Sequence, residues 1–197
     1  MKNKLLLTIA ILFLLAACSS NDQSQQSQDT TSQTETQSNT TFTADDLRTA
    51  SLQGDLNRVR QILEGDVDIE ESDQVGRTAL MFASYNGHTE VIGFLIEEGA
   101  VIEKQNSEGR TPLMFASSGP FPETVELLLQ NGASPDIKDS VEGWTALMYA
   151  AAEGNREVIE VLLDYDADVS LQDADGETAL DFARNNGHSG AVSLLEN

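Results

Sequence analysis

Apolar residues recur at the same places along most of the chain. A phrase that begins with threonine occurs four times, as TALMFA at Thr78, TPLMFA at Thr111, TALMYA at Thr145 and TALDFA at Thr178. The spacings between these threonines are 33, 34 and 33 residues. A fixed spacing of this length is typical of a chain built from stacked copies of one small unit.

Each unit predicts two short helices. Thr111 followed by Pro112 predicts an N-cap and the first position of a helix, and Gly87 predicts the left-handed residue that ends one. Apolar residues then return at helical spacing and predict a second helix over the stretch TEVIGFLIEE. Both helices are shorter than the ~12–15 residues that an isolated helix needs. Neighbouring units must cover their apolar faces, which predicts an all-α solenoid.

An earlier and weaker copy of the pattern begins near Ala44, because Leu47 and Gly54 lie 33 residues before Leu80 and Gly87. The first copy lacks the threonine phrase and the last stops after its second helix, as expected of terminal caps. The register predicts five units, at residues 44–72, 73–105, 106–139, 140–172 and 173–197. Within them we expect buried side chains at Leu80, Leu95 and Leu147, and positive φ angles at Gly87, Gly99 and Gly132.

The repeated unit resembles the ankyrin repeat. That family's motif is Gly-x-Thr-Pro-Leu-His-x-Ala, then Gly-His, an apolar helix and Gly-Ala, and GRTPLMFA, GWTALMYA and NGHTEVIGFLIEEGA are similar to it. The resemblance covers residues 44–197 and implies an ankyrin-repeat solenoid of helix pairs joined by projecting β-hairpin loops. In the third unit Pro120-Phe121 replaces Gly-His. The consensus histidine is also replaced, so we expect its hydrogen bond to be absent; the residues in its place are Met81, Met114, Met148 and Asp181.

The chain begins with a leader that is first positively charged and then apolar. The apolar run from Leu5 to Ala17 is shorter than the ~20 residues of a membrane-spanning helix. It ends in Leu15-Ala16-Ala17-Cys18, which resembles the lipobox of bacterial lipoproteins. The resemblance implies that residues 1–17 are removed as a signal peptide and that lipid is attached to the Cys18 sulfur. The alternative is an ordinary secretory signal with an incidental cysteine.

A polar segment follows the leader. Residues 18–43 are dominated by Gln, Ser, Thr and Asn, and their only large apolar residue is Phe42. Such a composition predicts a disordered tether, with a root-mean-square span of ~25–30 Å. Ser19 after the lipobox resembles the pattern that directs lipoproteins to the outer membrane. We therefore expect a protein anchored in the bacterial cell envelope, at the outer membrane facing the periplasm or at the cell surface.

The charge balance excludes one large class of partners. The chain has 33 acidic and 11 basic residues and a formal net charge of −22. Binding of phosphates requires Lys and Arg to displace counterions, so we expect no nucleic-acid partner.

A single cysteine, Cys18, also rules out an intramolecular disulfide. We expect a monomer that contacts the membrane only through the lipid on Cys18.

The sequence contains no catalytic or metal-binding motif that we recognise, among them GxSxG, GxxxxGK, HExxH and CxxC. His88 and His188 occupy the same slot three units apart, too far from each other to share a metal. We interpret both as turn residues that bond the backbone. We therefore expect no enzymatic activity, no cofactor and no metal. The acidic loop residues are interpreted as a solvated surface, with weak cation binding as the alternative.

Positions that are identical in every unit serve stacking, so positions that differ are candidates for recognition. The resemblance places these along the concave groove and at the hairpin tips, where partners bind. The predicted partner-binding residues are Gln74, Arg77, Tyr85, Asn86, Glu108, Arg110, Val141, Glu142, Trp144 and Glu153. Arg77, Arg110 and Trp144 share one slot in successive units, and we expect a row with an exposed Trp144 as its anchor. Alternatively, each arginine pairs with a nearby carboxylate and Trp144 only covers the hairpin stem.

These observations favour a membrane-anchored envelope lipoprotein that acts as a protein–protein interaction scaffold through its groove and hairpin tips. Two other functions stay open. One is an acidic, cation-associated envelope protein without a specific protein partner, including an adaptation to high salt. The other is an enzyme with an unrecognised site.

Overall fold

The computed structural model describes residues 41–196, so the leader, Cys18 and most of the expected tether lie outside the described range. The described residues form ten α-helices and contain no strand. The helices are α1 (Ala44–Gln53), α2 (Leu56–Leu63), α3 (Ala79–Tyr85), α4 (Thr89–Glu97), α5 (Pro112–Ser117), α6 (Pro122–Gln130), α7 (Ala146–Glu153), α8 (Arg156–Asp164), α9 (Ala179–Asn185) and α10 (Ser189–Leu195).

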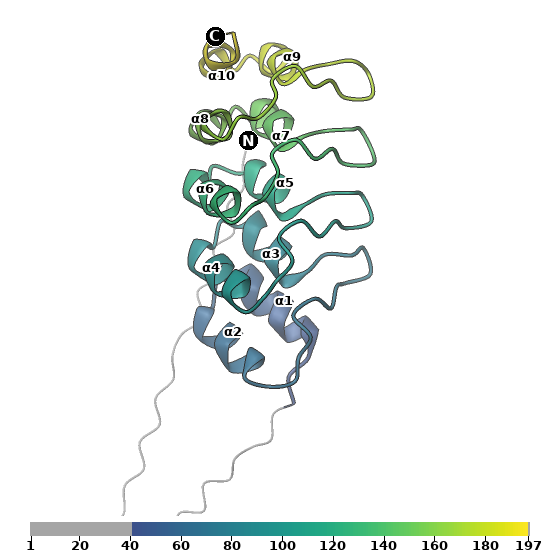
Figure 1. Cartoon of the computed structure of the whole chain (residues 1–197), viewed down its shortest axis with the longest axis vertical. Coiled ribbons are helices and arrows are strands. Elements are labelled where there is room, and N and C mark those ends of the chain that lie inside the picture. The colour runs from purple at the N-terminus through teal and green to yellow at the C-terminus, as the bar shows by residue number, and fades with distance from the viewer. Residues whose placement is uncertain (1–40, 197) are drawn as a thin grey trace, which may run out of the picture. The chain divides into compact units, whose positions relative to one another are not determined.

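The helices stack as antiparallel pairs in chain order (Figure 1). The odd-numbered helices contact one another in one row, from α1 to α9, and the even-numbered helices form a second row from α2 to α10. The loops that lead into α3, α5, α7 and α9 project sideways from the odd-numbered row as narrow hairpins (Figure 1). The predicted all-α solenoid of helix pairs is confirmed.

A threonine caps the start of each odd-numbered helix. The hydroxyl of Thr111 accepts a hydrogen bond from Met114 N at 3.4 Å, and Met114 Sδ accepts one from Thr111 N at 3.5 Å. At α9, Asp181 Oδ2 accepts from Thr178 N at 2.9 Å. These reciprocal bonds satisfy backbone donors that a helix start leaves free. In three of the four units the slot of the consensus histidine thus still bonds to the cap, contrary to our expectation, because a thioether or a carboxylate accepts instead. At Met81 the expected absence of this bond is observed.

Close packing between units explains the glycine that ends α1 and the one that follows α3. A Cβ on Gly54 would lie 2.5 Å from Nδ1 of His88, and a Cβ on Gly87 would lie 2.3 Å from the ring of Phe121. His88 Nε2 also lies 2.9 Å from the carbonyl oxygen of Leu52 in the preceding unit. His88 is therefore a turn residue that bonds the backbone, as predicted. Phe121 fills the same place in the third unit by packing alone.

A continuous apolar core runs through the stack, from Leu47 in α1 to Leu195 in α10. The three leucines predicted to be buried are 1, 0 and 2% exposed, at Leu80, Leu95 and Leu147 respectively. The predicted positive φ angles are also observed, at Gly87, Gly99 and Gly132. Each pair of helices covers the apolar faces of its neighbours, which short helices cannot bury alone.

The folded unit includes two residues that the sequence analysis assigned to the tether. Thr43 caps α1 and forms a capping box with Asp46. The ring of Phe42 packs against the core, and the guanidinium of Arg58 lies 4.3 Å from its centroid. The only large apolar residue of the polar segment is thus part of the first helix pair.

Replacing Leu147 with Ala should destabilise the stack by about 2–5 kcal/mol, because the site is closed on all sides and a cavity would remain. Val169 offers a matched control, since its side chain is 43% exposed and its truncation should change the unfolding free energy by less than about 0.5 kcal/mol. Urea denaturation monitored by circular dichroism measures both variants. An unchanged midpoint for Leu147→Ala would contradict the register.

Candidate functional site

Backbone hydrogen bonds between neighbouring units hold the hairpins in a row. Three of these bonds join the four hairpins: Ser107 N to Val75 O at 2.9 Å, Ser140 N to Glu108 O at 2.9 Å, and Ala174 N to Glu142 O at 2.8 Å. The tips therefore keep fixed positions along the stack. The predicted tip residues are all exposed, at Gln74, Glu108, Val141 and Glu142.

One Asp or Asn side chain closes each hairpin from within. Asp73 Oδ1 accepts hydrogen bonds from the backbone N–H groups of Val75 and Arg77, at 3.0 and 2.9 Å. Such side chains commonly bond to the backbone of their own turn. Our sequence analysis missed this role, although an Asp or Asn stands five or six residues before each of the four phrase threonines. The corresponding residues in the other hairpins are Asn106, Asp139 and Asp173.

In the fourth unit this turn is linked to a tyrosine. The hydroxyl of Tyr149 donates to Asp139 Oδ2 at 2.6 Å. Burial alone raises the pKa of Asp139, but the hydrogen bonds from Tyr149 and from three backbone N–H groups outweigh it and hold the pKa below its usual value. Burial and the bond to Asp139 raise the pKa of Tyr149 far above its usual value. This pair stays fixed as carboxylate and phenol at neutral pH.

Trp144 is half-buried, which differs from the exposed indole that we expected. Its ring lies 5.1 Å from that of Tyr149 and 4.4 Å from that of Phe182 in the next unit, measured between centroids. The guanidinium of Arg110 lies over the Tyr149 ring, at 5.4 Å. Trp144 thus covers the stem of its hairpin and remains partly exposed to solvent.

The two predicted arginines pair with carboxylates of their own hairpins. Arg77 Nε donates to Asp73 Oδ2 at 2.8 Å, and its guanidinium lies 4.7 Å from the centroid of the Phe82 ring. Arg110 Nε lies 3.4 Å from a carboxylate oxygen of Glu108. The pairing with Glu108 was the alternative interpretation in the sequence analysis. The side chains of Arg77 and Arg110 remain 42 and 35% exposed, so both still reach solvent.

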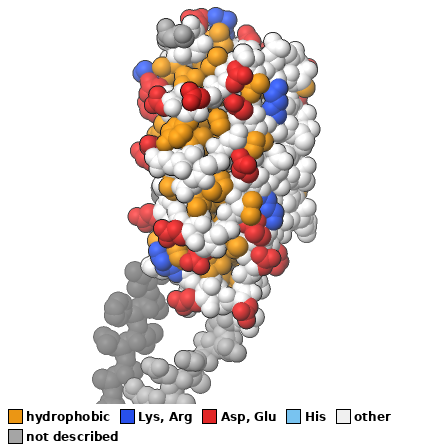
Figure 2. Space-filling model, in the orientation of Figure 1, with side chains coloured by type: hydrophobic (Ala, Val, Ile, Leu, Met, Phe, Trp, Pro, Cys, Tyr) orange, Lys and Arg blue, Asp and Glu red, His pale blue; other side chains and the backbone are white. Residues whose placement is uncertain are grey.

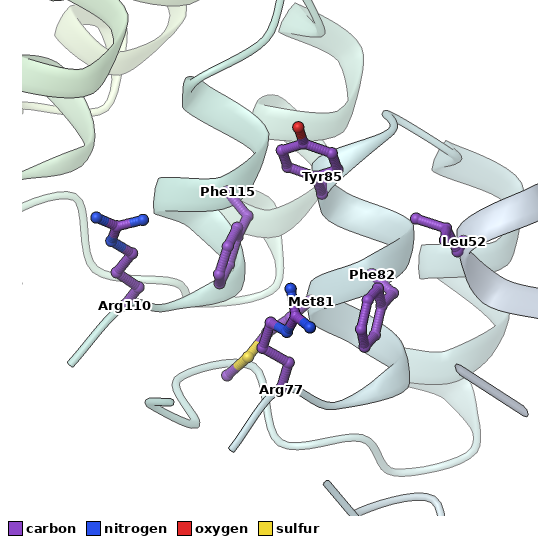
Figure 3. A pocket seen from close by; sticks show the side chains of 7 residues that line it. All are labelled: Leu52, Arg77, Met81, Phe82, Tyr85, Arg110 and Phe115. Carbon is purple, nitrogen blue, oxygen red and sulfur yellow. The ribbon is translucent and has the colours of Figure 1, made fainter. Parts of the chain in front are cut away.

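A pocket of about 400 Å³ lies between these arginines. Side chains from the first three units line it (Figure 3), and they are Leu52, Arg77, Met81, Phe82, Tyr85, Arg110 and Phe115. Met81 is almost fully buried at its base, whereas Tyr85 is 56% exposed and contacts the edge of Phe115. A largely apolar lining with a few fixed polar groups is characteristic of binding pockets. The structure thus brings Arg77, Tyr85 and Arg110 together.

The remaining predicted residues differ in their roles. Asn86 Nδ2 donates to Leu52 O at 2.7 Å, so it joins two units as well as facing solvent. Glu153 is exposed at the end of α7. In the view of Figure 2, Asp and Glu side chains are spread along the stack with apolar side chains between them.

The described residues contain neither a metal-binding cluster nor a membrane-spanning helix. Among residues 41–196 no group of three or more His, Cys, Asp or Glu side chains is placed to hold a metal ion. The same part of the chain has no helix with the length and hydropathy needed to cross a bilayer. Cys18, the predicted lipidation site, is outside the described residues.

The stacked helix pairs and the row of hairpins define a repeat protein of the solenoid class, in which each unit contacts only its neighbours. The family profile described as "Ankyrin repeats (3 copies)" matches residues 47–139 and 116–197. The chain belongs to the ankyrin-repeat family, and this membership indicates a protein–protein interaction role. No curated protein matches the chain.

Asp139→Asn tests the charged turn. A carboxyl whose pKa is lowered on folding stabilises the protein above its unfolded pKa of about 4, and this stabilisation is lost as pH falls through the folded pKa. We expect the variant to unfold more easily at pH 7, by about 1–2 kcal/mol, and to lose less stability than wild type between pH 5 and pH 3. Asn106 shows that an amide closes the same turn.

The control for this prediction is Asp175→Asn, which removes the same charge from an exposed hairpin tip. It should leave the pH dependence of the melting temperature unchanged. Parallel melting curves for both variants and wild type from pH 3 to pH 8 measure the difference. Identical profiles for all three proteins would contradict the stabilising role of the Asp139 carboxylate.

Proposed function

We propose that this chain is a lipid-anchored protein of the bacterial envelope whose ankyrin domain binds a protein partner through the hairpins and the odd-numbered helices. The observation that carries the proposal is the pocket of about 400 Å³ between Arg77, Tyr85 and Arg110. Along the whole stack their slots hold different residue types, such as Arg, Arg, Trp and Glu before the phrase threonine, whereas the residues beneath them repeat and are buried. The repeating positions hold the stack and the variable positions are free to recognise a partner.

Rigidity supports a role in binding. The hairpins are fixed by bonds between units and by an Asp or Asn inside each turn. A surface that is ordered before binding loses less conformational entropy when a partner docks. Tyr85 and Trp144 add aromatic area with few rotatable bonds, which is typical of residues that dominate binding energy.

The anchor rests on the leader sequence. Leu15-Ala16-Ala17-Cys18 ends an apolar run of signal-peptide length, and Cys18 is the only cysteine in the chain. A single acyl chain holds a protein only weakly, so stable anchoring requires two or more chains. Diacylglyceryl attachment to Cys18 supplies two. The polar residues that follow would separate the ankyrin domain from the lipid surface.

Cys18→Ala should abolish lipid attachment. We expect the variant to persist as an unprocessed precursor or to be released in soluble form. Phase separation in a mild detergent, followed by intact mass measurement, distinguishes the products. Ser19→Ala is the control, because it alters the adjacent residue and keeps the thiol. A Cys18→Ala protein that is still cleaved before residue 18 and still enters the detergent phase would refute the lipoprotein assignment.

Affinity capture from envelope extracts tests the binding role. Tyr85→Ala and Trp144→Ala should each weaken capture of the partner by about 2 kcal/mol or more, which is roughly thirtyfold. Circular dichroism is needed beside Trp144→Ala, because that residue also packs on Tyr149 and Phe182. Val169→Ala, at an exposed loop outside the pocket, should capture as wild type does. Equal capture by all variants would exclude this surface.

A further inference from the structure

The surface that carries the pocket is divided into two halves of different character. The half over the second and third units contains the pocket, whose base is Met81 and whose aromatic walls include Phe82 and Phe115. In the view of Figure 3, Phe115 lies between the side chains of Arg77 and Arg110. Such a pocket accepts a bulky apolar side chain, which would bury its surface against aromatic rings.

The two arginines restrict what enters this pocket. Arg77 is held by Asp73 and the Phe82 ring, and Arg110 is held near Glu108 and over Tyr149. Their guanidinium groups are therefore fixed at the rim, and moving them aside would break these contacts. A Lys or Arg side chain would meet two guanidinium groups there and no unpaired carboxylate, because Asp73 and Glu108 already pair with the arginines, so a base gains nothing at the pocket and favours another register.

The half over the fourth and fifth units is acidic. Four carboxylates on its hairpins and at the end of α7 form no ion pair with any Lys or Arg of the described residues, and they are Glu142, Glu153, Asp175 and Glu177. Glu177 accepts one hydrogen bond, from Asn185 Nδ2 at 3.0 Å. A carboxylate that has no cationic partner in the protein is stabilised more by a cation of the ligand than a carboxylate that is already paired.

One row shows the change of character along the stack. The slot just before the phrase threonine holds Arg77, Arg110, Trp144 and Glu177 in successive units. Packed helices lie ~8–10 Å apart, so the pocket and the acidic half are separated by ~20 Å. An extended chain spans at most ~3.3–3.6 Å per residue, so about six residues bridge the two.

We propose that this surface binds an extended, basic protein segment in one register. A bulky apolar side chain of the segment occupies the pocket between Arg77 and Arg110. Lys or Arg side chains about six residues away lie against Glu142, Glu153 and Glu177. This inference rests on the proposed binding function and adds the chemistry and the register of the occupant.

Charge complementarity on two length scales supports a basic occupant. The chain carries a formal charge of −22, which attracts cationic segments and repels anionic ones at long range. At short range the unpaired carboxylates select the position of the bases, while the pocket offers a base no unpaired carboxylate. The unpaired carboxylates repel an acidic peptide at one end of the site, and the two arginines at the other end attract it only weakly, because each already has a carboxylate neighbour.

The test uses the full chain in detergent and a defined probe peptide. The probe has one Phe, a spacer of six alternating Gly and Ser residues, and three Lys, with both termini blocked. Two control peptides replace either the Phe or the three Lys by Ser. Trp144 is the only tryptophan of the chain and lies in the fourth unit, in the acidic half of the surface, so its fluorescence reports binding there without a label.

We expect the probe to bind at least about tenfold more tightly than either control peptide. Tyr85→Ala should lower the affinity for the probe and leave the affinity for the peptide without Phe unchanged. The double variant Glu153→Gln/Glu177→Gln should lower the affinity for the probe by roughly fivefold to tenfold and leave the affinity for the peptide without Lys unchanged. Glu97→Gln with Glu98→Gln removes the same charge at the end of α4, and should change little at constant ionic strength.

Three results would overturn the inference. If both pairs of Glu→Gln changes weaken probe binding equally, the attraction is diffuse and not located at Glu153 and Glu177. If the peptide without Phe binds as tightly as the probe, the pocket is not used. If the probe does not bind at all, the proposed basic segment with one apolar residue is not the occupant. Capture of the natural partner is measured separately. If that capture depends on Tyr85 while the probe fails, the binding function stands and only the proposed occupant is wrong.

Discussion

The contact between neighbouring units is the interaction on which the rest of the structure depends. Within residues 41–196 the longest helix has ten residues, too few for a stable isolated helix, and each of these helices is completed by the pair above or below it. The contact is close because Gly54 and Gly87 have no side chain where His88 and Phe121 of the next unit lie. Apolar burial and this close approach together set the position of each pair. The row of hairpins then follows, since bonds such as Ser107 N to Val75 O form only between units already in register.

Most of the fold is predictable from the sequence because its determinants are local and repeat at a fixed spacing. Thr111 and Pro112 mark a helix start and Gly87 marks a turn, and none of these assignments requires knowledge of distant residues. The histidine slot shows the limit of reasoning from a consensus. Met114 and Asp181 are chemically unlike histidine, yet each accepts the hydrogen bond from the capping threonine. Several side chains can serve as the acceptor at the third helical residue, and α3 shows that the helix also starts without one, since Met81 accepts no such bond.

The candidate site was less predictable because it is made of contacts across units. The slot that holds Arg77, Arg110 and Trp144 was visible in the sequence, and the structure places the two arginines beside one pocket. The exposure of Trp144 was not predictable, since it is decided by Tyr149 and by Phe182 of the following unit. Likewise, only the folded arrangement shows that Arg110 lies over Tyr149 rather than over the indole. Pattern reasoning gives the position of a side chain along the stack, and packing decides what it touches.

The charge pattern can select a ligand only because the stack is rigid. On a flexible chain the distance between Arg77 and Glu177 would vary widely, and a change from positive to negative charge along the sequence would not favour one ligand over another. Here the units hold the two side chains at a nearly constant separation, so a ligand must match both ends at once. A second contact on the same rigid surface then acts at high effective concentration and adds affinity without further ordering of the protein. Conversely, a segment with its apolar residue and its bases in the wrong register gains only one of the two contacts. Selectivity for register therefore arises from the rigidity of the repeats rather than from any single residue at the surface.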